Sequence, residues 1–85
     1  MPYRDPIPEL KRQLGVELAV IVARWNPSDI ASILETEPSR IADLRRGELK
    51  RFSLESLIRF LGRLGRCVEL QVGPPPRFNN HLTKE

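Results

Sequence analysis

The side chains best suited to bind a ligand are basic and lie in the second half of the chain. Residues 40–66 hold eight Arg and Lys against three Asp and Glu, a net charge of +5, whereas the rest of the chain holds six against eight. Arg and Lys neutralise phosphate oxygens, and the Arg fork also matches the O6 and N7 acceptors of guanine. The segment therefore predicts a nucleic-acid-binding surface, although charge alone is equally consistent with a solvated helical face.

Side chains typical of catalysis and of metal sites are scarce. The only His, His81, lies near the C-terminus, and the only Cys, Cys67, has no His near it in the sequence. A single Cys excludes an internal disulfide and a Cys-based zinc site, and it suits the reducing cytoplasm. No glycine-rich phosphate loop is present. We therefore expect no enzymatic activity, no cofactor and no metal.

Two short helices would position the basic residues. In residues 25–47, WNPSDIASILETEPSRIADLRRG, two sets of apolar side chains follow helical spacing: Ile30, Ala31 and Leu34, then Ile41 and Leu44. The four residues between the sets, Glu35 to Pro38, are too few for either helix to bury its apolar side except against the other. This is the layout of a helix-turn-helix, whose second helix enters the major groove of DNA.

Capping residues support these helix boundaries. Asn26 suits the N-cap of the first helix and Pro27 its first turn. Either Thr36 or Glu37 can cap the second helix. Gly47 suits the left-handed residue that ends it.

The same stretch resembles the helix-turn-helix of Cro/repressor-like (XRE) regulators, in particular the short HigA-type antitoxins. The shared positions are Trp25, Ile30, Ala31, Leu34, Ile41, Leu44 and Gly47. The following GELKRFSLESLIRFLGRLGRCVELQV is similar to the next helix and C-terminal strand of that subfamily, so the resemblance covers residues 25–72. It implies an all-α, lambda-repressor-like domain of four helices with one C-terminal β-strand that pairs across a dimer.

The resemblance also implies a function. The chain is expected to be a homodimeric, sequence-specific regulator of transcription that binds double-stranded operator DNA. It would be the antitoxin of a type II toxin-antitoxin pair, repressing its own operon and binding a ribonuclease-type toxin. The alternative is a protein-interaction module that neutralises a toxin with weak or no DNA binding.

Three positions depart from the family pattern: Pro27 replaces Gln, Glu35 replaces the turn Gly, and Glu37 replaces Ser. Glu35 must either adopt a left-handed conformation, which costs about 1–2 kcal/mol, or alter the turn. Glu35 and Glu37 also place two negative charges beside the second helix, where the helix dipole stabilises them but DNA would not.

The expected DNA contacts fall into two groups. Residues near the start of the second helix reach base edges, and the candidates are Glu37, Ser39, Arg40 and Asp43. Arg40 is the best candidate for guanine. The candidates for phosphate contacts are Arg45, Arg46, Lys50 and Arg51.

The remaining helices surround the motif. Residues 1–8 are expected to be an irregular lead-in, and residues 9–24 an amphipathic helix that Gly15 loosens. Trp25 is expected in the core. Ser53 can cap a last helix that runs to about Leu64. The apolar side of the first helix is wider than one contact requires, so it faces either its own domain or a partner chain.

Near the C-terminus, the spacing of the apolar residues changes from helical to alternating. Val68, Leu70 and Val72 alternate with Cys67, Glu69 and Gln71, which is typical of a half-buried strand. No second strand is visible in the chain, so we expect the strand to pair with that of a second copy through a dimer interface formed by Val68, Leu70 and Val72. The helix-turn-helix domain with this strand spans residues 9–72, and residues 73–85 are expected to be a disordered tail.

No stretch of the sequence predicts a membrane segment. The longest apolar block, residues 18–23, is far too short to span a bilayer, and residues 1–4 are not followed by an apolar region of signal-peptide form. We expect a cytoplasmic protein without a membrane partner.

Overall fold

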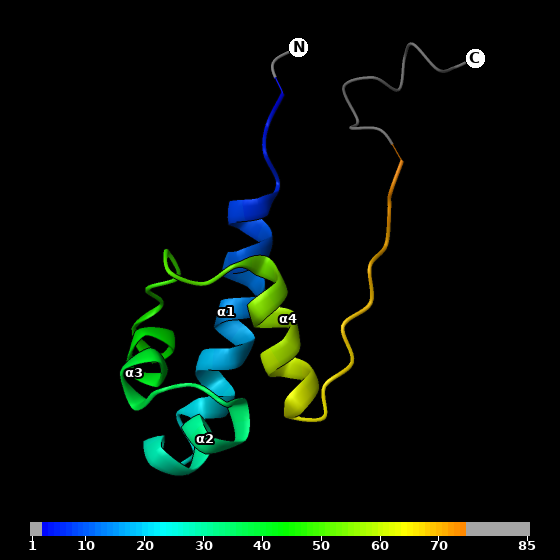
Figure 1. Cartoon of the computed structure of the whole chain (residues 1–85). Coiled ribbons are helices and arrows are strands. Elements are labelled where there is room, and N and C mark those ends of the chain that lie inside the picture. Colours follow the sequence, from blue (N-terminus) through cyan, green and yellow to red (C-terminus); the bar gives the residue numbers. More distant parts are fainter. Residues whose placement is uncertain (1–2, 75–85) are drawn as a thin grey trace, which may run out of the picture.

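The computed structural model describes residues 3–74, which form four helices (Figure 1). The helices are α1 (Ile7–Val22), α2 (Pro27–Leu34), α3 (Pro38–Arg46) and α4 (Leu54–Arg63). The predicted all-α class with four helices is confirmed, and residues 3–74 contain no β-strand within the single chain. None of the described helices has the length and apolarity needed to cross a membrane.

A single core lies where α1 packs against α3 and α4, and where α2 packs against α3. The apolar residues that predicted the helix-turn-helix are all buried in this core. The core residues are Leu18, Val22, Ile30, Ala31, Leu34, Ile41, Leu44, Phe52, Leu57 and Leu61. The core thus holds α3 against α1, and α2 against α3 and α4.

The helix ends follow the capping chemistry of the sequence. Asn26 Oδ1 accepts from the backbone N–H of Ser28 at 2.8 Å, which caps α2. Glu37, rather than Thr36, occupies the N-cap of α3, although its side chain makes no capping hydrogen bond. Gly47 ends α3 in the left-handed region, with φ 75°. These predicted boundaries of the motif are confirmed.

Gly15 has a packing role in α1. It is buried, and a Cβ atom at this position would lie 2.6 Å from Leu49 Cδ1. Its missing side chain therefore lets the loop after α3 approach α1. The first turn of α1 is held by Arg12, which donates to Glu9 Oε2 at 2.6 Å and is the main cause of a Glu9 pKa of about 2.

Trp25 is not a core residue, contrary to the sequence-based prediction. Its side chain is 46% exposed. The helix that contains Leu18 and Val22 ends at Val22, so Trp25 lies in the turn before α2 and outside the buried stripe of α1.

Residues 66–74, called here the C-terminal arm, leave the helical body as an extended segment (Figure 1). Leu70 and Val72 are 83% and 90% exposed, and Val68 is 38% exposed. The strand predicted here would pair between two chains, so within one chain it stays a prediction. Most of the predicted disordered tail, residues 75–85, lies outside the described residues.

Candidate nucleic-acid interface

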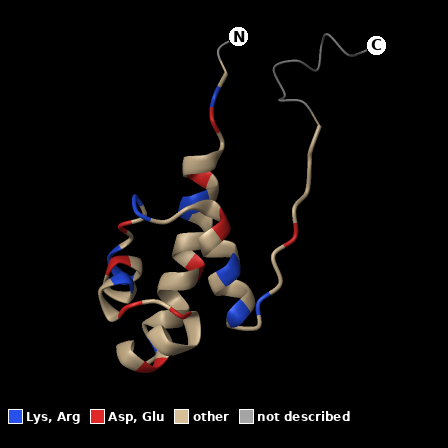
Figure 2. Ribbon diagram, viewed as in Figure 1, with Lys and Arg blue, Asp and Glu red and all other residues tan. Residues whose placement is uncertain are grey.

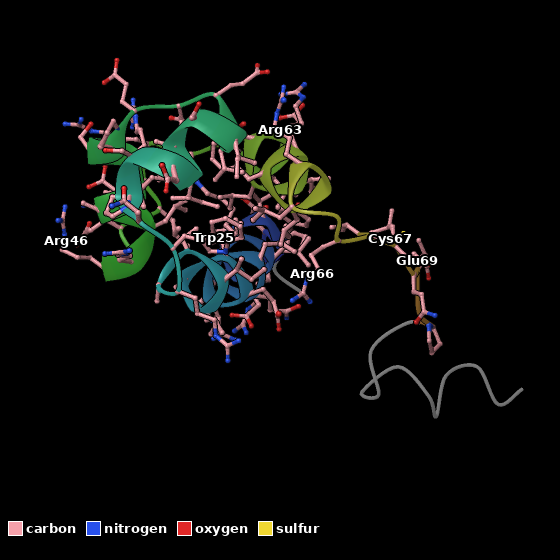
Figure 3. All side chains as sticks on the ribbon, turned by 90° about the horizontal axis from the view of Figure 1, so that it is seen from below. Trp25, Arg46, Arg63, Arg66, Cys67 and Glu69 are labelled. Atoms are coloured by element: carbon pink, nitrogen blue, oxygen red, sulfur yellow. The ribbon has the colours of Figure 1, made fainter. Side chains whose placement is uncertain are left out.

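The exposed side of α3 is set by the residues that it buries. Ile41 and Leu44 face the core, so the opposite side of the helix carries residues at helical spacing. These residues, called here the outward face of α3, are Ser39, Ala42, Asp43 and Arg46. Arg46 is on the left of Figure 3, on the opposite side of the picture from the arm residues Cys67 and Glu69. The outward face is thus available to bind a ligand without involving the arm.

Two residues of the outward face form an ion pair. Arg46 Nη2 lies 2.6 Å from Asp43 Oδ1, one helical turn earlier. The Arg46 side chain is 62% exposed, while that of Asp43 is 19% exposed. A guanidinium carries five N–H donors, so this pair orients Arg46 and leaves it donors for a phosphate.

The basic residues beyond α3 gather beside Arg46. A shallow hollow of about 310 Å³ is lined by Asp43, Arg46, Glu48, Lys50 and Arg51. Three of the four phosphate candidates therefore lie on one surface, at the end of α3 and in the loop before α4 (Figure 2). The three basic side chains outnumber the two acidic ones in this lining, which leaves the surface weakly basic and suited to phosphates.

Arg45, the fourth phosphate candidate, has a structural partner instead. Its Nη2 donates to the backbone oxygens of Trp25 at 2.7 Å and Val22 at 3.1 Å. These carbonyls belong to the end of α1 and the turn after it, where intrahelical donors run out. Arg45 therefore fastens α3 to α1. The sequence carries no signal for this contact, because the acceptors are backbone atoms some twenty positions away.

Arg40, the favoured base-reading candidate, points away from the outward face. Its guanidinium carbon lies 5.7 Å from the centre of the Phe52 ring, which in turn meets Phe60 edge to face at 6.0 Å. Arg40 Nη1 is buried and has no hydrogen-bond partner among residues 3–74. Arg40 can reach a base only after its guanidinium leaves the ring.

Glu35 is one of the three positions that depart from the family pattern, and the structure shows which of its two options it takes. It adopts the left-handed conformation, with φ 57° and ψ 47°, so the turn keeps the geometry that glycine normally provides. Both carboxylate oxygens accept from Arg63 of α4, at 3.0 and 3.1 Å. This pair partly neutralises Glu35 and holds the turn against α4.

The start of α3 carries the remaining base-reading candidates. Glu37 and Ser39 are both exposed. Glu37 has extended backbone geometry, with φ −100°, and Pro38 follows it as the first residue of the helix. Ser39 and Asp43 thus share the outward face, while Glu37 lies at its edge. No group of three His, Cys, Asp or Glu side chains within residues 3–74 could hold a metal ion.

Comparison with known proteins adds one finding. A family model described as a helix-turn-helix domain matches residues 9–73, which include nearly all of α1, the whole of α2, α3 and α4, and most of the arm. No curated protein and no solved structure gives a significant match. The predicted helix-turn-helix is therefore confirmed, while the HigA-type subfamily stays a prediction.

Proposed function

The chain belongs to the helix-turn-helix domain family, and on this basis we propose that it is a dimeric, sequence-specific DNA-binding regulator of transcription. The observation that supports this most is the outward face of α3 beside the basic hollow. In a helix-turn-helix, the N-terminal part of the second helix contacts base edges while neighbouring residues hold the phosphates. In this chain, polar residues lie on the outward face of α3, and basic residues gather at the end of α3 and in the loop that follows.

The geometry favours a division of roles among the exposed residues. Ser39 and Asp43 would contact base edges, since a hydroxyl suits several bases and a carboxylate accepts from cytosine N4. Arg46, Lys50 and Arg51 would bind phosphates and set the register on DNA. Arg46 would do so in an orientation fixed by Asp43.

Salt-dependent binding to the DNA upstream of its own gene tests this proposal. The affinity should fall steeply as salt rises, because each phosphate contact releases counterions. Arg46→Ala should weaken binding to specific and scrambled DNA alike, and should reduce the slope of log affinity against log salt by roughly 0.9. Arg59→Ala, an exposed arginine of α4, is the matched control. An unchanged slope in Arg46→Ala would contradict its phosphate role.

The dimer is proposed to form through the C-terminal arm. Val68, Leu70 and Val72 alternate along the arm, so they would lie on one face of a strand that pairs with a second copy. Leu70→Asp should shift the protein to the mass of one chain in sizing chromatography. Gln71→Asp adds the same charge on the opposite face and should leave the dimer intact. If the Leu70→Asp protein is still a dimer, the arm does not form the interface.

We further propose that the protein is the antitoxin of a toxin-antitoxin pair and represses its own operon. The support is the resemblance of residues 25–72 to HigA-type antitoxins. The neighbouring gene should then encode a small basic ribonuclease, and the two products should copurify. If the gene has no such neighbour and no product copurifies, the antitoxin proposal is contradicted and only the proposal of a DNA-binding regulator remains.

An acidic surface favours one alternative. Glu35 and Glu37 are exposed beside the start of α3, where they repel the DNA backbone. On this alternative the protein neutralises a toxin through protein contacts and binds DNA weakly. Copurification with a neighbouring gene product, combined with equal and weak affinity for specific and scrambled DNA, would favour it over the regulator.

A further inference from the structure

The outer side of α1 carries apolar side chains that the protein itself does not cover. Val20 is 59% exposed, and Val16, one turn earlier, is 51% exposed. Trp25 continues this surface beyond the end of α1. Val20, Ile21, Arg24 and Trp25 line a shallow hollow of about 290 Å³ together with Arg66, the first residue of the arm. Val20, Ile21 and Trp25 are called here the α1 surface.

The α1 surface continues into the arm. A second hollow, of about 480 Å³, joins α1 and α4 to the start of the arm, and its lining includes Leu14, Arg66 and Val68. Arg66 lines both hollows, so they adjoin each other. Figure 3 shows the arm continuing from Arg66 away from the body. A strip of apolar side chains, interspersed with Glu17, Arg24, Arg66 and Glu69, therefore runs from α1 to the point where the arm leaves.

A ribbon of two paired arms requires apolar cover. Two strands alone are marginally stable in water, and they need a helix or further strands against their apolar face. Leu70 and Val72 lie on that face, and their own chain leaves them almost fully exposed. A pair of arms would therefore need a helix against its apolar face. The α1 surface is the side of a helix that its own chain leaves uncovered.

We propose that the α1 surface of each protomer receives the apolar face of the arm of a second copy, so that the paired arms lie across both first helices. This inference rests on the proposed dimer and specifies what the arm contacts. It makes Val20, Ile21 and Trp25 interface residues along with Val68, Leu70 and Val72. In Figure 3, Arg46 lies on the opposite side of the picture from the arm residues Cys67 and Glu69, with Trp25 between them.

Trp25 provides a direct measurement, because it is the only tryptophan in the chain. At 46% exposure its fluorescence in a lone protomer should be red-shifted. As the concentration of the full chain is raised and the dimer forms, the emission should move to shorter wavelength. The midpoint of this shift should fall at the same concentration as the midpoint of the mass change in analytical ultracentrifugation. Leu70→Asp should keep the red-shifted emission at every concentration.

A matched pair of variants tests the α1 surface separately from the arm. Val20→Asp should raise the dissociation constant of the dimer at least tenfold. Ile33→Asp on α2, where the side chain is 40% exposed, should leave the dissociation constant unchanged. Far-UV circular dichroism checks that both variants retain the helices, and the wild-type emission shift tests the inference even if Val20→Asp does not fold.

Two kinds of outcome would overturn the inference, and a third would contradict the proposed function while supporting the inference. A dimer that forms without an emission shift, or with equal strength in folded Val20→Asp, means that the arms pack elsewhere while the DNA-binding dimer stands. A protein that binds DNA specifically as a monomer overturns both this inference and the dimeric part of the function. A dimer with the emission shift but no specific DNA binding supports the interface and contradicts the regulator.

Discussion

Three arginines of one short helix have three different environments. Arg45 donates to backbone oxygens at the end of α1, Arg40 lies over the ring of Phe52, and Arg46 pairs with Asp43 on the exposed side. The sequence marked all three as DNA-contacting candidates, because composition reports charge but not direction. Only Arg46 of the three projects from the outward face of α3.

Arg45 should contribute to stability rather than to DNA binding. Arg45→Met removes two hydrogen bonds to carbonyls and should lower the free energy of unfolding by about 1–2 kcal/mol. The melting temperature should fall by roughly 4–8 °C for each kcal/mol in a domain of this size. Calorimetry measures this change. A melting temperature equal to that of the wild type would contradict the role of Arg45 as a fastener between α3 and α1.

Arg40→Met should behave differently from Arg45→Met. The buried Nη1 of Arg40 has no partner in residues 3–74, so an apolar side chain of similar length removes an unsatisfied donor as well as the contact with Phe52. The free energy of unfolding should stay within about 1 kcal/mol of the wild type, because these two effects oppose each other.

The DNA-binding role of Arg40 requires a separate measurement. If its guanidinium leaves Phe52 to bind guanine, Arg40→Met should lose about 1–3 kcal/mol of discrimination between specific and scrambled DNA. Competition binding with the two DNAs measures this quantity. An equal loss for both DNAs, or no loss, would assign Arg40 to the packing of the loop alone.

The elements were more predictable than the side-chain contacts. The apolar spacing of α2 and α3, the Asn26 cap and Gly47 are local signals, and each appears in the structure as expected. The exposure of Trp25 was missed, because its place depends on where α1 ends. The closeness of Gly15 to Leu49 was also missed, because it joins residues far apart in the sequence. The ion pair between Glu35 and Arg63 was missed for the same reason, since these residues are also far apart in the sequence.

The turn between α2 and α3 yields a prediction for the element as a whole. Glu35→Gly relieves a left-handed non-glycine residue, worth about 1–2 kcal/mol, and loses an exposed ion pair worth at most about 1 kcal/mol. Glu35→Ala loses the pair and keeps the unfavourable conformation. Thermal unfolding should therefore rank the variants as glycine, then the wild type, then alanine.

A change in DNA binding should accompany the change in the turn. Glu35→Gly and Glu35→Ala remove the same negative charge near α3, so both should bind DNA more tightly than the wild type at low salt. Arg63→Ala, which exposes the Glu35 charge without a partner, should bind less tightly. Equal affinities in the wild type and all three variants would mean that the turn lies far from DNA, and the opposite order would contradict repulsion by Glu35.

At the scale of the whole molecule, the body and the arm have separate tasks. The helical body buries its core within one chain and presents the outward face of α3. The arm carries exposed apolar residues at alternate positions, and its proposed cover is a second chain. The body was predictable from the sequence because its contacts are internal, whereas the partner of the arm lies outside the chain. A two-fold pair would present two copies of α3 to successive major grooves, ~34 Å apart.

Hydroxyl-radical protection mapping on the DNA upstream of the gene shows whether a dimer places two α3 helices on one face of DNA. We expect two protected segments whose centres are about one helical turn apart, ~10–10.5 base pairs, with both lost together in Leu70→Asp. A single protected segment that persists in Leu70→Asp, or no protection at any salt concentration, would contradict it.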